Sequence, residues 1–157
     1  MQNMAERSPS VRKLAIDASA MAKWFLSDES YVAEALALKA EVDAGRASLH
    51  APTHVHYEVA NLLRRAVRAR RITRVQAEQA ITDMLEAPIS LTDAPDILQE
   101  ALALSLERNL SFYDACYLAV AQLINGSLIS DDRNMRRALG GNDPHVVWLE
   151  NYTPPQI

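Results

Sequence analysis

Short apolar runs alternate with longer amphipathic segments along most of this chain. An apolar run of four or five residues is typical of a strand with both faces buried, and these runs lie at residues 14–17, 48–51, 89–91, 127–130 and 145–149. Between them, apolar residues recur every three or four positions, which predicts helices. The predicted helices lie near residues 18–26, 30–45, 52–66, 73–86, 93–108, 111–124 and 132–139.

The order of these elements predicts an α/β fold with three layers, α/β/α, and a parallel sheet. Ser30 is the expected cap of one helix, Thr73 is the expected start of a second, and Pro52 is the expected first residue of a third. We expect one domain over residues 12–150, with a flexible tail at 1–11 and a second tail at 151–157.

Composition agrees with a single globular domain and excludes a wholly disordered chain. The chain has 157 residues, of which 49% are hydrophobic and 23% charged. Its single cysteine, Cys116, cannot form an internal disulfide. Residues 1–13 lack the apolar core of a signal peptide, and the uncharged stretch 115–130 is too short and polar to span a bilayer. We therefore expect a cytoplasmic protein with no membrane association.

Net charge is −4, which argues mildly against binding to nucleic acid, yet the basic residues are unevenly distributed. Two groups of arginines can create local positive potential within an acidic total. The groups are Arg64, Arg65, Arg68, Arg70, Arg71 and Arg74, and Arg133, Arg136 and Arg137. The first group has two interpretations, a solvated helix end or a surface that binds RNA or a partner.

Acidic residues follow two of the predicted strands. Asp17 ends the first apolar run, and Asp131 and Asp132 follow the run at 127–130. Ligands of open parallel sheets bind beyond the carboxyl ends of the strands. Glu58 and Asp114 lie at the edges of apolar helix faces, where a carboxylate needs a partner. A divalent cation is one such partner, because Mg²⁺ and Mn²⁺ prefer oxygen ligands and can activate water.

Four short motifs carry a resemblance to a known family. They are Ile-Asp17-Ala-Ser19, Tyr-Glu58-Val-Ala-Asn61, Tyr113-Asp114-Ala and Ser130-Asp131-Asp132. In this order, and on these kinds of element, they resemble the PIN-domain nucleases, particularly the VapC-type toxins of toxin–antitoxin pairs. The resemblance covers residues 14–149. One departure is Ser130, where the family usually has threonine, and the substitution keeps a hydroxyl.

The resemblance implies a sheet of four or five parallel strands and a metal-dependent endoribonuclease that uses Mg²⁺ or Mn²⁺. It implies that metal-activated water hydrolyses RNA phosphodiesters. The implied catalytic and metal-binding acids are Asp17, Glu58, Asp114 and Asp132. Ser19 and Ser130 would orient these carboxylates through hydrogen bonds. Matching Ser130 to the family threonine favours Asp132 over Asp131 as the fourth acid, and Asp131 remains open as a ligand through water.

The resemblance also implies partners: an RNA substrate, a second copy of the chain in a homodimer, and a cognate antitoxin. DNA would be bound only indirectly, through the antitoxin. Two alternatives remain open, a housekeeping RNA-processing nuclease without an antitoxin, and a catalytically weak module that binds RNA or protein. Fold and function separate readily, so the resemblance supports the fold more strongly than the toxin role.

Each site residue also has a purely structural interpretation. Ser111 and Asp114 have the spacing of a capping box, and Asp132 can cap the helix that follows it. Glu58 can pair with an arginine on a neighbouring turn, and it also lies one helical turn after His54. That last pair has the spacing of two zinc ligands, but no third ligand has matching spacing.

Overall fold

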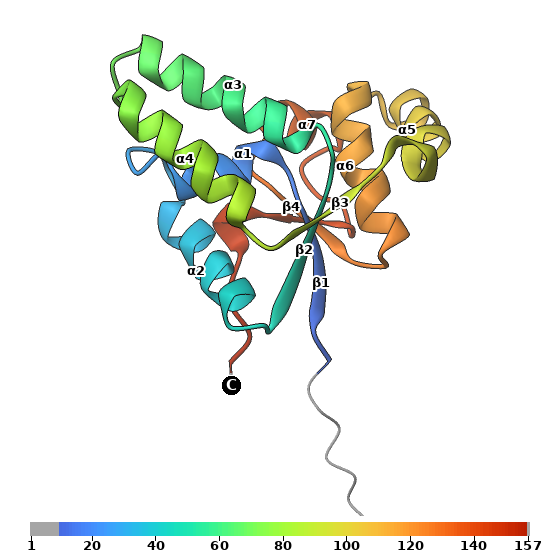
Figure 1. Ribbon diagram of the computed structural model, residues 1–157. Helices are drawn as coiled ribbons and strands as arrows, with labels where there is room; N and C mark the ends of the chain where they lie inside the picture. Colours follow the sequence, from blue (N-terminus) through green and yellow to red (C-terminus); the bar gives the residue numbers. More distant parts are fainter. Residues whose placement is uncertain (1–9, 157) are drawn as a thin grey trace, which may run out of the picture.

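Five parallel strands form the centre of the protein (Figure 1). The computed structural model describes residues 10–156. The strands are β1 (Arg12–Ile16), β2 (Ala47–Pro52), β3 (Ile89–Thr92), β4 (Ser127–Ser130) and β5 (Val146–Trp148), in the order β3-β2-β1-β4-β5. The strand order reverses at β1, because β2 and β3 extend the sheet on one side and β4 and β5 on the other. The predicted α/β fold is confirmed, with five strands.

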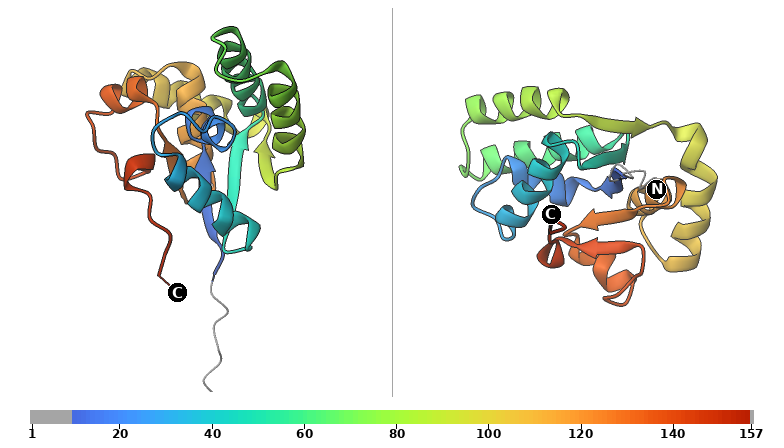
Figure 2. Two further views of the ribbon diagram at one scale, coloured as in Figure 1. Left: turned by 90° about the vertical axis from the view of Figure 1, so that its left-hand side faces the viewer. Right: turned by 90° about the horizontal axis from the view of Figure 1, so that it is seen from below.

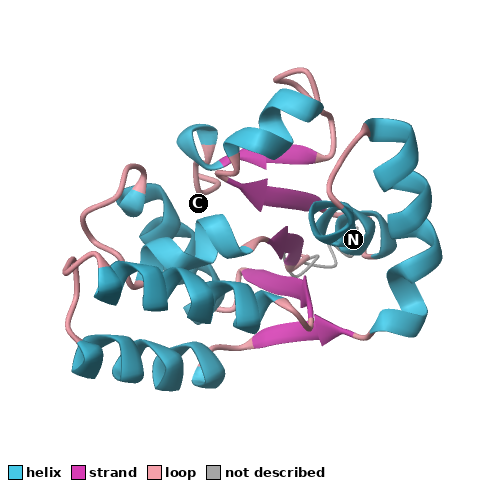
Figure 3. Ribbon diagram, turned by 90° about the horizontal axis from the view of Figure 1, so that it is seen from above, coloured by secondary structure: helices cyan, strands magenta, loops and turns pink. Residues whose placement is uncertain are grey.

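Helices cover both faces of this sheet, which completes the three layers (Figures 2 and 3). On one face α6 (Phe112–Leu123) packs on β1, β2 and β4, and α5 (Ala94–Arg108) packs on α6. The other face carries α1 (Ala18–Met21) and α2 (Val32–Asp43). A hairpin of α3 (Val55–Arg68) and α4 (Arg74–Glu86) packs on α1, and α7 (Arg133–Ala138) follows β4.

The core lies along the central strands and α6. Ala15, Ile16, Leu128 and Ile129 are fully buried, as expected for strands with helices on both faces. Every residue of α6 from 115 to 121 is buried, because this helix lies between the sheet and α5. The N-terminal turn of α6, which carries Asp114, is therefore fixed relative to the strand ends.

Two of the predicted helix starts are wrong. Pro52 ends β2 instead of starting a helix, and it pairs with Thr92 of β3 at the end of the strand, where its missing N–H is tolerated. Ser30 does not cap α2, because Tyr31 occupies the capping position with a left-handed backbone (φ 61°). The predicted helix start at Thr73 is confirmed, and Thr73 caps α4 in a reciprocal pair of hydrogen bonds with Gln76.

The start of β1 contacts the C-terminal segment at the end of the sheet opposite the acidic strand ends. Of the two predicted tails, residues 1–9 and 157 lie outside the described residues. Arg12 begins β1, and its guanidinium donates to the hydroxyl of buried Tyr152 at 3.1 Å. None of the helices in residues 10–156 is long and apolar enough to cross a membrane.

Candidate active site

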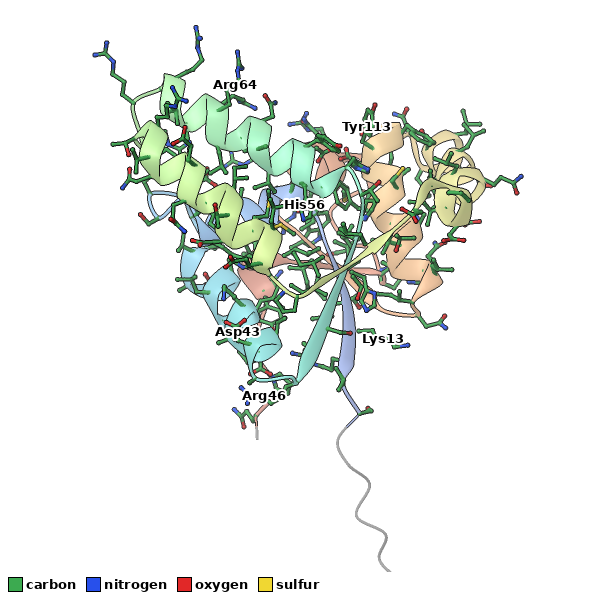
Figure 4. All side chains as sticks on the ribbon, in the orientation of Figure 1. Lys13, Asp43, Arg46, His56, Arg64 and Tyr113 are labelled. Atoms are coloured by element: carbon green, nitrogen blue, oxygen red, sulfur yellow. The ribbon has the colours of Figure 1, made fainter. Side chains whose placement is uncertain are left out.

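The four predicted acids lie at the carboxyl end of the sheet and on the helices above it. Asp17 directly follows β1, and Asp132 follows β4, its neighbouring strand. Glu58 and Asp114 are in the first turns of α3 and α6. Figure 4 labels His56 and Tyr113, which are close in sequence to these two acids; Tyr113 lies near the top of α6, and His56 lies lower, nearer the middle of the view.

Asp17 is buried and receives three hydrogen bonds. Its Oδ1 accepts from the Ala20 N–H at 3.0 Å and from Ser19 Oγ at 2.7 Å, and its Oδ2 accepts from Ser130 Oγ. Burial is the main influence on this carboxyl, and it outweighs these bonds and raises the pKa of Asp17 to about 7. A nearby cation would stabilise the ionised form of this carboxyl, which is only partly ionised near neutral pH.

The two serines connect Asp17 to the loop after β4. While donating to Asp17, Ser19 Oγ accepts from the Asp131 N–H at 2.9 Å. In the same way, Ser130 Oγ accepts from the Asp132 N–H at 3.0 Å. Each hydroxyl thus fixes the aspartate of one strand end relative to the backbone of the other. Among the four predicted acids, Asp17 is the one to which both hydroxyls donate.

Asp131 and Asp132 are neighbours in sequence with different surroundings. The negative charge of Asp132 contributes to raising the pKa of Asp17, Glu58 and Asp114 alike. Its Oδ1 also accepts from the Met135 N–H at 2.7 Å and so caps α7, as its structural interpretation predicts. Asp131 instead lies with Oδ2 2.9 Å from Nζ of Lys23. The shared acidic environment therefore includes Asp132, while the charge of Asp131 is balanced by a lysine.

Lys23 is a site-adjacent residue that the sequence interpretation missed. It is 4% exposed, and its ammonium contacts Glu29 Oε2 at 3.2 Å as well as Asp131. Arg71, at the tip of the helical hairpin, holds Glu29 and also forms a two-pronged pair with Asp28. A lysine within the apolar segment 21–26 is the sequence feature that could have revealed this network.

A polar cavity of about 380 Å³ opens beside this network. Its lining includes Lys23, Asp131, Asp132, Arg133 and Glu150. Of the four predicted acids, Asp132 alone lines this cavity.

Glu58 and Asp114 are only half-buried. Glu58 Oε2 accepts from the Tyr117 hydroxyl at 2.9 Å, so the buried Tyr117 orients the acid as well as packing in the core. Partial burial is the main cause of a raised pKa at both Glu58 and Asp114, and the charge of Asp132 adds to it. Asp114 lies beside the cap of α6, where its N–H donates to Ser111 Oγ at 3.1 Å.

The donor set suits a hard divalent cation, because all four acids offer carboxylate oxygens. Over residues 10–156, however, no three histidine, cysteine or acidic side chains already form a group able to hold a metal ion. The acids are electrostatic neighbours rather than a closed ligand cage. His54 Nε2 lies 3.5 Å from Glu58 Oε1, but no third ligand in this range completes a zinc site there.

The fold and its acidic strand ends define a class of parallel α/β protein whose ligand site lies where the strand order reverses. A model of the PIN domain matches residues 14–140, and the chain belongs to the PIN-domain family.

Proteins similar to this chain include a ribonuclease and a chain of a toxin–antitoxin complex. Ribonuclease VapC3 of Pyrobaculum aerophilum is 31% identical over 126 residues, which are 78% of this chain and 92% of that relative. The crystal structure of PAE2754 from the same organism is 26% identical and has a TM-score of 0.63, covering 90% of this chain and 93% of that one. A chain of the toxin–antitoxin complex from Klebsiella pneumoniae shares the fold at 20% identity, with a TM-score of 0.54 and coverage of 85% and 95%.

Proposed function

We propose that this protein is a metal-dependent endoribonuclease that acts as the toxin of a toxin–antitoxin pair in the cytoplasm. The observation that carries the proposal is the acidic environment shared by Asp17, Glu58, Asp114 and Asp132 at the carboxyl end of the sheet. The ribonuclease activity stated for VapC3 supports the reaction class. A bound Mg²⁺ or Mn²⁺ would supply Lewis-acid activation of water and neutralisation of the substrate phosphate.

In this proposal each acid has its own role. Asp17 and Asp114 would hold the principal ion, and the hydrogen bonds of Ser19 and Ser130 keep Asp17 in place. Glu58 would orient or deprotonate the attacking water, and the burial that raises its pKa above the ordinary value makes it a stronger base. Asp132 completes the site, and Asp131 remains paired with Lys23.

The proposed partners are RNA, a cognate antitoxin and a second copy of the chain. The toxin–antitoxin complex among the structural neighbours supports the antitoxin, and DNA would be reached through that partner. A row of exposed leucines on α5 supports protein–protein contact, because apolar surface of this kind is commonly buried in assemblies. These leucines are Leu98, Leu102 and Leu106.

Cleavage of a mixed RNA pool by the purified protein tests the nuclease. We expect cutting with Mn²⁺ or Mg²⁺, none with chelator, and none by Asp114→Asn with either metal. Asp96→Asn, which removes an exposed acid of α5 outside the site, serves as the matched control and should cut like wild type. Cutting that survives Asp114→Asn would contradict the assigned site, and a wild-type protein that binds RNA without cutting it would favour the binding module.

Expression in bacterial cells tests the toxin role separately. Wild-type protein is expected to arrest growth, and Asp17→Asn is expected to relieve the arrest without lowering the protein level. Co-expression of a small protein encoded directly upstream should restore growth to wild-type-expressing cells. Equal arrest by Asp17→Asn would show that any toxicity has another source.

A further inference from the structure

The basic side chains divide into those paired with an acid and those left unpaired. Salt bridges within residues 10–156 engage Arg12, Lys23, Lys39, Arg46, Arg71, Arg74, Arg108 and Arg136. The arginines that form no salt bridge in that part of the chain are Arg64, Arg65, Arg68, Arg70, Arg133 and Arg137. All six are exposed, so their charges are available to a ligand.

These unpaired arginines lie on or just after the two helices that begin at site acids. The helix α3 carries Glu58 in its first turn and arginines toward its end, and α7 is capped by Asp132. Figure 4 shows Arg64 projecting from the upper edge of the molecule, whereas Lys13 lies toward the opposite end of the sheet. Unpaired arginines are therefore concentrated on the side of the molecule that carries the acidic site.

Two exposed tyrosines stand next to the acids themselves. Tyr57, 79% exposed, precedes Glu58, and Tyr113, 60% exposed, precedes Asp114. The ring of Tyr113 makes an edge contact with His54, with ring centroids 5.2 Å apart, which restrains its orientation. Exposed aromatic rings beside a basic surface are the elements with which proteins bind unpaired nucleotides, by stacking bases and tracking the backbone.

We propose that Tyr57, Tyr113 and the unpaired arginines of α3 form a path for single-stranded RNA that crosses the acidic site. This inference rests on the proposed ribonuclease function. Along α3, from Tyr57 to Arg68, the path extends about 16 Å at the usual helical rise. Arg65 and Arg68 lie on the side of this helix away from the buried Val59 and Leu63, so they face solvent.

The arrangement solves an electrostatic problem. The chain carries a net charge of −4, and its acids gather where the scissile phosphate must bind, so a polyanion would be repelled without local compensation. Arginines that are already paired with acids supply little of this compensating positive charge. The unpaired arginines of α3 can supply it, because they lie on a helix that begins in the site. Bases that stack on Tyr57 and Tyr113 must be unpaired, which favours single-stranded RNA over a duplex.

The salt dependence of RNA binding tests this path. Short labelled RNAs of random sequence are titrated against the full chain with Mg²⁺ present, and Asp114→Asn is included in every protein to prevent cleavage. For single strands, the slope of log affinity against log salt is about −0.7 per contacted phosphate, so Arg65→Gln with Arg68→Gln is expected to make it shallower by about 1.4. Tyr57→Ala is expected to weaken binding by at least about fivefold with an unchanged slope, because stacking is not ionic.

Lys13→Gln is the matched control, since Lys13 is also exposed and unpaired within the described residues but lies at the other end of the sheet. It should change neither slope nor affinity. An unchanged slope in the double arginine variant, an equal change in Lys13→Gln, or tighter binding of duplex than of single-stranded RNA would each overturn the path. If wild type still cuts RNA in a manner that needs metal and Asp114, such a result refutes the path alone and leaves the nuclease function standing.

Discussion

The acidic site has a buried half and an open half that are built in opposite ways. In the buried half, Asp17 is 3% exposed and receives three hydrogen bonds, two of them from serines. In the open half, Glu58 and Asp114 are half-buried and lie in the first turns of helices. The comparison indicates different roles for the two halves. The buried acid is held in one orientation, whereas the open acids can change their orientation when a ligand binds.

Replacing one acid from each half gives the largest expected effects. Asp17→Asn and Asp114→Asn should each lower metal-dependent RNA cleavage by more than about a hundredfold, a larger loss than is usual for residues that only support metal ligands. Their effects on stability should differ. Without metal at pH 8, Asp17→Asn should raise the free energy of unfolding by about 2–4 kcal/mol, whereas Asp114→Asn should change it by less than about 1 kcal/mol.

The sign of this stability effect follows from the raised pKa of Asp17. Between its ordinary pKa of 3.8 and its folded pKa of about 7, the folded state binds the proton more tightly than the unfolded state. The free energy of unfolding of wild type therefore falls as pH rises through this window, and asparagine removes that loss. Chemical denaturation with chelator at pH 5 and pH 8 measures it. An advantage of Asp17→Asn that is equal at both pH values would contradict the assignment.

The next largest effect should distinguish Asp132 from Asp131. Asp132→Asn is expected to lower cleavage by about 10- to 100-fold. The reason is the loss of the negative charge that acts on the pKa values of the other three acids. Asparagine is itself a good helix cap, so α7 should remain folded and the loss should report the charge. Asp131→Asn serves as the matched control and should cost less than about fivefold, since Asp131 is paired with Lys23.

Steady-state cleavage rates and circular dichroism of both variants provide the measurement. A larger loss in Asp131→Asn than in Asp132→Asn would reverse the assignment of the fourth acid. It would also mean that the salt bridge from Lys23 influences the fourth acid directly and does not only stabilise the loop.

Much of this architecture could be predicted from local patterns, because strand and helix periods are local properties. The apolar run before Asp17 predicted β1, and Thr73 predicted the start of α4. The contacts of Lys23 and Tyr117 could not be predicted in this way. Their partners Asp131 and Glu58 are far away in the sequence, and only the folded chain brings them together. Pro52 misled the prediction because proline suits both the first turn of a helix and the end of a strand.

The smallest expected effect concerns the open half, where the Tyr117 hydroxyl is the only hydrogen-bond donor to Glu58 from another helix among the described contacts. Tyr117→Phe keeps the buried ring and removes this bond, so Glu58 keeps its place in α3 but loses its orientation. Because the bond lowers the pKa of Glu58, its loss should raise that pKa and move the acid limb of the pH–rate profile to higher pH. Cleavage at neutral pH should fall by about three- to tenfold, which matches the roughly 0.5–1.5 kcal/mol net contribution of a typical hydrogen bond. Tyr113→Phe, which removes a neighbouring exposed hydroxyl and keeps its ring, should leave the profile in place. A uniform fall of activity in Tyr117→Phe at every pH, without a shift of the limb, would mean that Tyr117 supports the core and does not position the acid.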